Sequence, residues 1–263
     1  MYFKSLEDKM LYYRSLSDYK LLPNSYVICM LDGRSFSKLI KNKFKKPFDD
    51  DFIQMMNETA EYLCKNVEGC KFGYVQSDEI SLLISDNDTP LTDSFFKYRL
   101  CKIQSILASM AASKFNQLMF KYLYRKDNTI IDKIDTIKLV EFDCKAWNVP
   151  SFNDAYAWFL YRQNDCIKNS KQQTAQTYLS HQQLHGLVTD EQIKLLKETK
   201  NVDWNLLSDD KKYGRFISKK TLTKSCIVKG ETKFVERRVW YCEPGFILQE
   251  NFDKFENFLK SNS

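Results

Sequence analysis

Glycine and proline are scarce in this chain, at 7 and 5 of its 263 residues, which disfavours a linker-rich or collagen-like protein. Long apolar runs are also missing: the best of them, such as 27–31, are far too short to cross a bilayer. The N-terminal sequence MYFKSLEDKM has acidic residues and no apolar stretch, so we expect neither a signal peptide nor a typical transit peptide. These absences predict an ordered globular protein in the cytoplasm, without a membrane partner. A mitochondrial location stays open.

Paired cysteine motifs are absent as well. The 8 cysteines are scattered without a C-x-x-C pair, and a chain of this length can build a core without disulfides. We therefore expect reduced thiols. The only histidines are His181 and His185, whose i, i+4 spacing could hold zinc. Because no third ligand is evident, we expect a surface or packing role for this pair.

Hydrophobic periodicity and turn signals divide the chain into helices and strands. In the first half we predict strands at 26–33, 71–77, 79–85 and 136–143, and helices at 5–16, 50–67 and about 93–123. After the first helix the order is β-α-β-β-α-β, the split βαβ or ferredoxin-like arrangement. The second half predicts helices at 153–185 and 189–200, strands near 214–222 and 233–242, and a helix near 252–260.

The predicted fold class is therefore α+β. We expect a palm-like catalytic core over 1–145, and over 146–263 an extension of helices and β-rich segments that packs on the core and contacts RNA. No internal repeat or low-complexity linker separates the two parts. The same core serves as the palm of polymerases and cyclases and as an RNA-binding module, so the fold alone does not decide the function.

Three carboxylates fall at the ends of predicted strands. Asp32 ends the first strand, and Asp78 and Glu79 lie between the second and the third. The first and third strands are central neighbours in this topology, so the three side chains should converge at one end of the sheet. Carboxylates brought together repel unless a cation compensates, and Mg²⁺ suits such hard oxygen ligands. We predict that the three residues are catalytic, with two Mg²⁺ ions clamping a nucleoside triphosphate for in-line displacement.

The residue after Asp32 bears on this prediction in two ways. Asp-Gly is an ordinary turn pair, so the motif alone does not require catalysis. In a catalytic site, Gly33 would let a phosphate approach the backbone.

Basic residues farther along the chain could neutralise phosphates. They are Lys46, close to Asp49, and the pair Arg99 and Lys102, spaced i, i+3 on the long predicted helix. A solvated helix face is the alternative for each of them. The net charge of +6 fits a polyanionic partner such as RNA, although many small proteins carry a similar charge.

The predicted C-terminal strands mix basic and aromatic residues. Arg215, Lys219 and Arg237 lie here, close to Tyr213. Such a mixture marks a possible RNA path, with a plain basic surface as the alternative.

Five segments together resemble a known family. They are LDGRSFSKL at 31–39, KPFDDDF at 46–52, YVQSDEISLLI at 74–84, KYRLCKIQSILAS at 97–109 and FDCKAW at 142–147. In the same order, they are similar to motifs of the tRNA-histidine guanylyltransferase superfamily. The resemblance implies a homotetrameric 3′–5′ nucleotidyltransferase. Such an enzyme activates a tRNA 5′-monophosphate with ATP or GTP and adds a nucleotide through its 3′-OH.

The resemblance also implies roles for individual residues. Asp32, the Gly33 carbonyl and Asp78 would ligate the metal ions, with Glu79 beside them. Lys46 would contact the activating nucleotide. The full nucleotide-binding set would be Asp32, Gly33, Arg34, Ser35, Phe36, Ser37, Lys46, Asp49, Ser77, Asp78, Arg99 and Lys102.

Other segments depart from the eukaryotic guanylyltransferases. FDCK stands at 142–145 in place of their FDGR, and of their HINNLYN motif Asn169 survives. The segment 169–186 is similar instead to guanylyltransferase-like proteins of bacteria and some eukaryotic microbes, which implies templated repair of tRNAs with incomplete 5′ ends. Arg162 and Asn169 join the predicted RNA contacts. Addition of guanosine −1 to histidine tRNA is the alternative activity.

Two further classes of function stay open. A non-catalytic RNA-binding module would bind RNA without nucleotide turnover, although a carboxylate at Asp32 opposes RNA unless metal is present. A cyclase-like enzyme would form a cyclic product from ATP or GTP without RNA.

Overall fold

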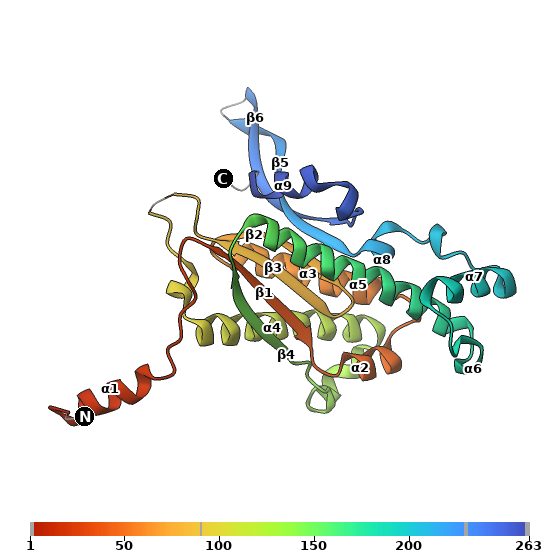
Figure 1. The fold of residues 1–263 in the computed structure, drawn as a ribbon, viewed down its shortest axis with the longest axis horizontal. Helices are drawn as coiled ribbons and strands as arrows, with labels where there is room; N and C mark the ends of the chain where they lie inside the picture. Colours follow the sequence, from red (N-terminus) through yellow and green to blue (C-terminus); the bar gives the residue numbers. More distant parts are fainter. Residues whose placement is uncertain (1–2, 90, 229–230, 261–263) are drawn as a thin grey trace.

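A computed structural model describes residues 3–89, 91–228 and 231–260. Its centre is a sheet in which all neighbouring strands run antiparallel, in the order β4-β1-β3-β2-β5-β6. The strands are β1 Tyr26–Gly33, β2 Cys70–Gln76, β3 Glu79–Ser85, β4 Phe142–Val149, β5 Arg215–Val228 and β6 Glu231–Pro244. The last two form a long hairpin whose far end projects beyond the helices (Figure 1).

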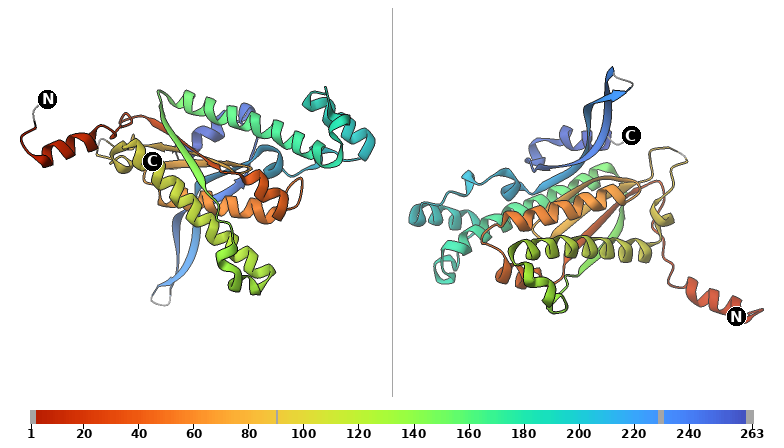
Figure 2. Two further views of the ribbon diagram at one scale, coloured as in Figure 1. Left: turned by 90° about the horizontal axis from the view of Figure 1, so that it is seen from below. Right: turned by 180° about the vertical axis from the view of Figure 1, so that it is seen from behind.

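Helices cover both faces of the sheet. Helices α3 and α4 lie on one face, whereas α5 and α9 lie on the other (Figure 2). The α-helices are α1 Leu6–Ser15, α2 Phe36–Lys43, α3 Asp50–Asn66, α4 Leu100–Lys126, α5 Phe152–Tyr178, α6 His181–Leu184, α7 Thr189–Lys200, α8 Asp209–Tyr213 and α9 Phe252–Lys260. Helix α1 stands apart from the body and buries none of its residues (Figure 1).

Alternate residues of β1 enter two separate cores. Cys29 and Leu31 pack in the cluster beneath α3 and α4, whereas Ile28 packs with Leu83 and Phe159 beneath α5. Because both faces are covered, the central strands read as continuous apolar runs rather than as an alternation. The even-numbered residues of β1, including Asp32, therefore face α5.

The predicted α+β class and the β-α-β-β-α-β order are confirmed. The predicted strand at 136–143 is wrong, because residues 128–136 form a 3₁₀ segment and the strand is Phe142–Val149. Asn116 of α4 fixes the segment before this strand: its side chain accepts from the N–H of Val140 and donates to the Val140 carbonyl. The boundary expected at residue 145 falls inside β4.

Two other local predictions are corrected. The long helix begins at Leu100 rather than near 93, because Phe96, Lys97 and Tyr98 have positive φ angles and break it. No helix is predicted between residues 33 and 50, whereas Phe36–Lys43 form helix α2. Its amphipathic pattern spans only 8 residues, which is too short for periodicity to stand out.

Two general properties complete the fold. The cysteines whose side chains are described are all free thiols. In the described ranges, none of the helices combines the length and apolar character needed to span a bilayer.

Candidate active site at one end of the sheet

Four polar residues form a row across the end of the sheet. The register places Asp143 of β4 opposite Asp32 of β1, Asp32 opposite Glu79 of β3, and Glu79 opposite Gln76 of β2. Residues directly opposite each other in antiparallel strands point to the same face, so the row faces α5. Asp78 occupies the turn between β2 and β3, after Ser77 with its φ of 45°. The structure therefore brings the three predicted carboxylates together.

Glu79 already has a counter-ion. Its Oε1 accepts from Arg162 Nε at 2.8 Å and its Oε2 from Arg162 Nη2 at 2.5 Å, in a fork supplied by α5. The two side chains are only 8% and 11% exposed. Burial raises the pKa of Glu79 above its usual value, and the Arg162 guanidinium opposes that shift. Glu79 thus joins the sheet end to α5 and is not an open metal ligand in this state.

Asp32 and Asp78 differ from Glu79 in having no ion pair within the described residues. Burial raises the pKa of Asp32, and repulsion from Asp78 and Asp143 adds to the shift. Burial likewise raises the pKa of Asp78, although a hydrogen bond with Ser77 opposes it. Neither carboxylate therefore has a cation in ion-pair contact, and the Arg162 guanidinium opposes the pKa shift of Asp32 only as a smaller effect.

These two carboxylates suit Mg²⁺ better than a metal with a closed protein cage. Within the described ranges, no group of three or more His, Cys, Asp or Glu side chains is arranged to hold a metal. Mg²⁺ is commonly bound by one or two carboxylates together with substrate phosphates, which matches Asp32, Asp78 and a nucleotide. His181 and His185 are exposed on and next to α6, away from this row.

A large cavity opens over the row. This outer cavity has a volume of about 1140 Å³ when the open solvent at its mouth is included, and Asp32, Asp78 and Glu79 line it. Helix α5 lines it as well, with four amides, those of Asn169, Gln172, Gln173 and Gln176. Lys46 and Ser37 also line it. An open cavity of this size can admit a nucleotide.

The N-terminus of α2 reaches the outer cavity through Ser37, whereas Ser35 and Phe36 line a separate hollow beside the same helix. Ser35, the residue before the helix, has a left-handed φ of 62° and makes no capping hydrogen bond. The first N–H groups of α2 therefore lack a side-chain acceptor, and such groups bind phosphate well. Ser37 reaches the cavity, but the side chain of Phe36 is 1% exposed and packs against Phe115 and Phe142. The predicted phosphate contact at Phe36 is thus limited to its backbone.

Packing gives a second reason for glycine at position 33, beside the predicted approach of a phosphate. A Cβ atom there would lie 2.3 Å from the ring of Phe36. The space beside Gly33 is filled by that core side chain, so packing alone requires glycine.

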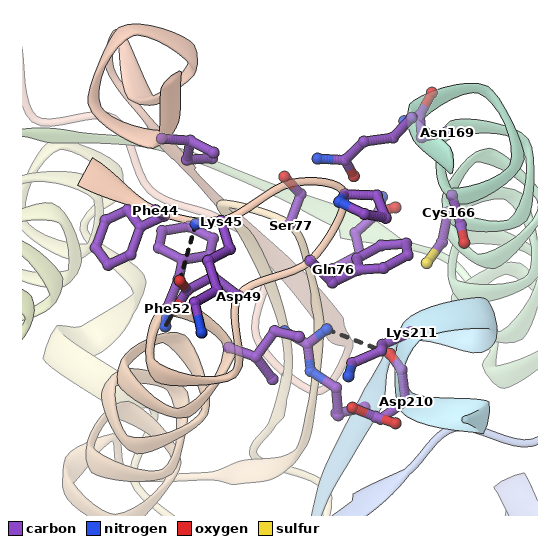
Figure 3. Close-up of a pocket in the computed structure, with 17 residues that line it drawn as sticks. Phe44, Lys45, Asp49, Phe52, Gln76, Ser77, Cys166, Asn169, Asp210 and Lys211 are labelled. Atoms are coloured by element: carbon purple, nitrogen blue, oxygen red, sulfur yellow. Dashed lines mark hydrogen bonds between the residues drawn. The ribbon is translucent and has the colours of Figure 1, made fainter. Parts of the chain in front are cut away.

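An inner hollow of about 600 Å³ adjoins the outer cavity and shares Gln76, Ser77 and Asn169 with it. Figure 3 shows Phe44 and Phe52 on one side, Cys166 and Asn169 of α5 on the other, and Asp210 and Lys211 of α8 below. Aromatic walls with a few polar groups are typical of a site for a flat ring. Asp49 lines this hollow too, but it caps α3 by accepting from the Phe52 N–H, and it also accepts from the N–H of Lys45 in the preceding loop.

Arg215 is buried in this hollow rather than exposed to RNA. Its side chain donates to Asn57 Oδ1 and to the Asp210 carbonyl, and its Nη2 has no partner. It is 5% exposed, so the predicted surface contact with RNA does not fit this state. A buried donor without an acceptor costs free energy that a ligand could recover.

Several predicted residues lie outside the cavity. The side chain of Arg99 donates to Asp18, and its backbone forms a β-bridge with Lys20. This contact lies near the end of the sheet that is far from Asp32, and Lys102 follows on α4. Arg34 forms an exposed ion pair with Glu141. Lys219 and Arg237 lie on the β5–β6 hairpin.

Sequence reasoning missed some residues of the site. Asp143 was assigned to the end of a strand, whereas it lies at the start of β4. The glutamines of α5 carry a signal that could have found them: with Asn169, residues 172, 173 and 176 fall at i, i+3, i+4 and i+7, which is one helix face.

Comparison with known proteins adds independent information. A family model described as tRNAHis guanylyltransferase matches residues 4–150. Among solved structures, a bacterial tRNA(His) guanylyltransferase-like protein in complex with ATP is 32% identical with a TM-score of 0.81, covering 97% of this chain and 99% of that one. The complex of such a bacterial protein with GTP gives 30% identity and a TM-score of 0.77 over the same shares. The probable tRNA(His) guanylyltransferase of Dictyostelium discoideum is 25% identical over 89% of this chain and 90% of that protein.

Proposed function

Because the chain belongs to the tRNAHis guanylyltransferase family and is therefore a nucleotidyltransferase, we propose that it adds templated nucleotides to incomplete 5′ ends of tRNA in the 3′–5′ direction. The outer cavity carries this proposal, because it combines the carboxylates Asp32 and Asp78, which form no ion pair within the described residues, with Ser37 in the uncapped first turn of α2. A triphosphate in this cavity would meet helix N–H groups at its phosphates. We place the activity in the cytoplasm.

The proposed reaction has two in-line displacements at phosphorus. First, an oxygen of the RNA 5′-monophosphate attacks the α-phosphorus of ATP or GTP, and pyrophosphate leaves. Then the 3′-hydroxyl of the incoming nucleotide attacks the activated 5′-phosphorus, and the nucleoside monophosphate leaves. Asp32, Asp78 and the Gly33 carbonyl would hold Mg²⁺, which when bound neutralises phosphate charge and acidifies the attacking hydroxyl.

The remaining residues of the cavity position the substrates. Lys46 and the N–H groups at the start of α2 face the phosphates. The base of the nucleotide fits the inner hollow, where Arg215 Nη2 offers a donor to a base acceptor. The ion pair of Glu79 with Arg162 fixes the end of β3 against α5, so both residues act as positioning residues.

The test uses a 5′-truncated, 5′-monophosphorylated tRNA with Mg²⁺ and nucleoside triphosphates. Wild-type protein should extend it to the length set by the opposite strand, and Asp32→Asn and Asp78→Asn should abolish extension. Asp190→Asn, a change at an exposed carboxylate on α7, is the matched control and should extend normally. Full activity of either cavity variant would overturn the metal-site assignment.

Assays with two kinds of RNA, truncated tRNAs and full-length histidine tRNA, distinguish repair from the addition of guanosine −1. The segment 169–186, which resembles guanylyltransferase-like proteins rather than the HINNLYN motif of the eukaryotic enzymes, supports repair. We expect efficient extension of truncated tRNAs of several kinds and little addition to full-length histidine tRNA. Preference for full-length histidine tRNA would favour the alternative.

Arg99 and Lys102 can contribute to this site only from another copy of the chain. They lie beside Asp18 and Lys20, at the end of the sheet away from the cavity of their own chain. We propose a homotetramer in which they hold phosphates of the nucleotide or RNA bound to a neighbour. Mixing inactive Asp32→Asn protein with inactive Arg99→Ala/Lys102→Ala protein should then restore activity, and light scattering should give four chains.

A further inference from the structure

A second hollow lies on the other side of helix α2. Its volume is about 780 Å³ with open solvent included, and the apolar residues Leu39 and Val140 line it. Its rim carries four cations, Arg34, Lys38, Lys43 and Lys138. Among the residues lining this basic hollow there is no acidic side chain.

Three of these cations lack a counter-ion. Arg34 is neutralised by Glu141, with 2.7 Å between Nη1 and Oε2. In contrast, Lys38, Lys43 and Lys138 are exposed and form no ion pair within the described ranges. The result is a local excess of positive charge, separate from the carboxylates of the outer cavity.

The basic hollow and the outer cavity are linked through one short helix. Ser37 and Ile40 of α2 line the outer cavity, whereas Lys38, Leu39 and Lys43 line the basic hollow. A helix with its side chains is about 10 Å across, so a nucleic-acid strand that ends at Asp32 can pass over α2 within a few nucleotides. Exposed Leu139, beside Lys138, adds an apolar contact suited to a ribose or base.

We propose that the basic hollow binds backbone phosphates of the RNA strand that leads to the 5′ end in the outer cavity. This proposal rests on the proposed function, because that function makes RNA the substrate. It adds the surface that binds the RNA. Charge complementarity is the basis, because three unpaired lysines around one hollow match successive phosphates. Lys38, Lys43 and Lys138 would set affinity for RNA and leave the binding of ATP and GTP unchanged.

The experiment compares two triple variants of equal charge. The first is Lys38→Gln/Lys43→Gln/Lys138→Gln. The second, the control, is Lys65→Gln/Lys121→Gln/Lys194→Gln, which removes three exposed lysines scattered over α3, α4 and α7. Binding of 5′-truncated, 5′-monophosphorylated tRNA is followed by fluorescence anisotropy at several salt concentrations, and nucleotide binding is measured in parallel.

For three lost phosphate contacts on a single strand, the slope of log Kd against log salt should fall by about 2. The Kd for RNA should rise on the order of 100-fold at 0.1 M salt. The control should change both quantities far less, and extension at saturating RNA should keep its kcat while KM rises. Equal weakening by the two triple variants would overturn the assignment of this surface. If the wild-type protein binds RNA through these lysines but extends no RNA, the proposed function is overturned and the assignment of this surface is kept.

Discussion

Replacing Arg162 with methionine tests the buried ion pair that joins α5 to the sheet. The change leaves Glu79 buried at 8% side-chain exposure without a counter-ion, next to Asp32 in the register. Removal of one partner of a buried pair costs about 3–5 kcal/mol. For a chain of this size, each kcal/mol corresponds to about 2–4 °C in Tm, so Arg162→Met should lower Tm by about 6–20 °C.

Replacing the other partner of the pair, Glu79, with glutamine should lower the stability less. In Glu79→Gln, Arg162 keeps its 3.1 Å contact with Asp165, which is partly exposed. The double variant should be less destabilised than the sum of the single variants, because neither partner is left buried and charged alone. Urea unfolding of the four proteins gives the coupling energy. A coupling below about 0.5 kcal/mol, the usual additivity error, would refute the interpretation of this contact as a stabilising pair.

Three further predictions follow from other contacts. Mg²⁺ with ATP at about 100 times Kd should stabilise the wild type by about 2.7 kcal/mol in thermal unfolding and should not stabilise Asp78→Asn. Asn116→Ala removes the amide that bonds the Val140 N–H and carbonyl, and urea unfolding should show a loss of about 1–3 kcal/mol. Gly73→Ala places a Cβ 2.8 Å from Cys64 Sγ and should cost about 1–3 kcal/mol, partly recovered by Cys64→Ala.

Local sequence patterns were sufficient for the centre of the sheet. Residues 26–33 form a continuous apolar run ended by Asp-Gly, which is how a strand covered on both faces reads. The single residue left between the predicted second and third strands required a tight turn, and Ser77 adopts the left-handed conformation that makes it. The convergence of Asp32 with Asp78 and Glu79 followed from this topology.

The remaining features depend on contacts that are distant in sequence. Residues 136–143 have the alternation of a strand, but Asn116 of α4 fixes Val140 outside the sheet and pairing with β1 begins at Phe142. Asp143 therefore moves from the end of a predicted strand to a position opposite Asp32. Similarly, no local signal links Glu79 to Arg162, because 83 residues separate them.

The four carboxylates at this end of the sheet differ because helix α5 supplies an ion pair to only one of them. Arg162 forms an ion pair with Glu79, whereas Asp32, Asp78 and Asp143 form none within the described residues. A triphosphate is itself strongly anionic, and in the outer cavity Lys46 and the start of α2 are the opposing groups on the nucleotide side. Nucleotide and carboxylates would repel each other at close range unless divalent cations bind between them. We infer that Mg²⁺ and triphosphate bind together rather than in sequence, because each supplies the charge that the other requires.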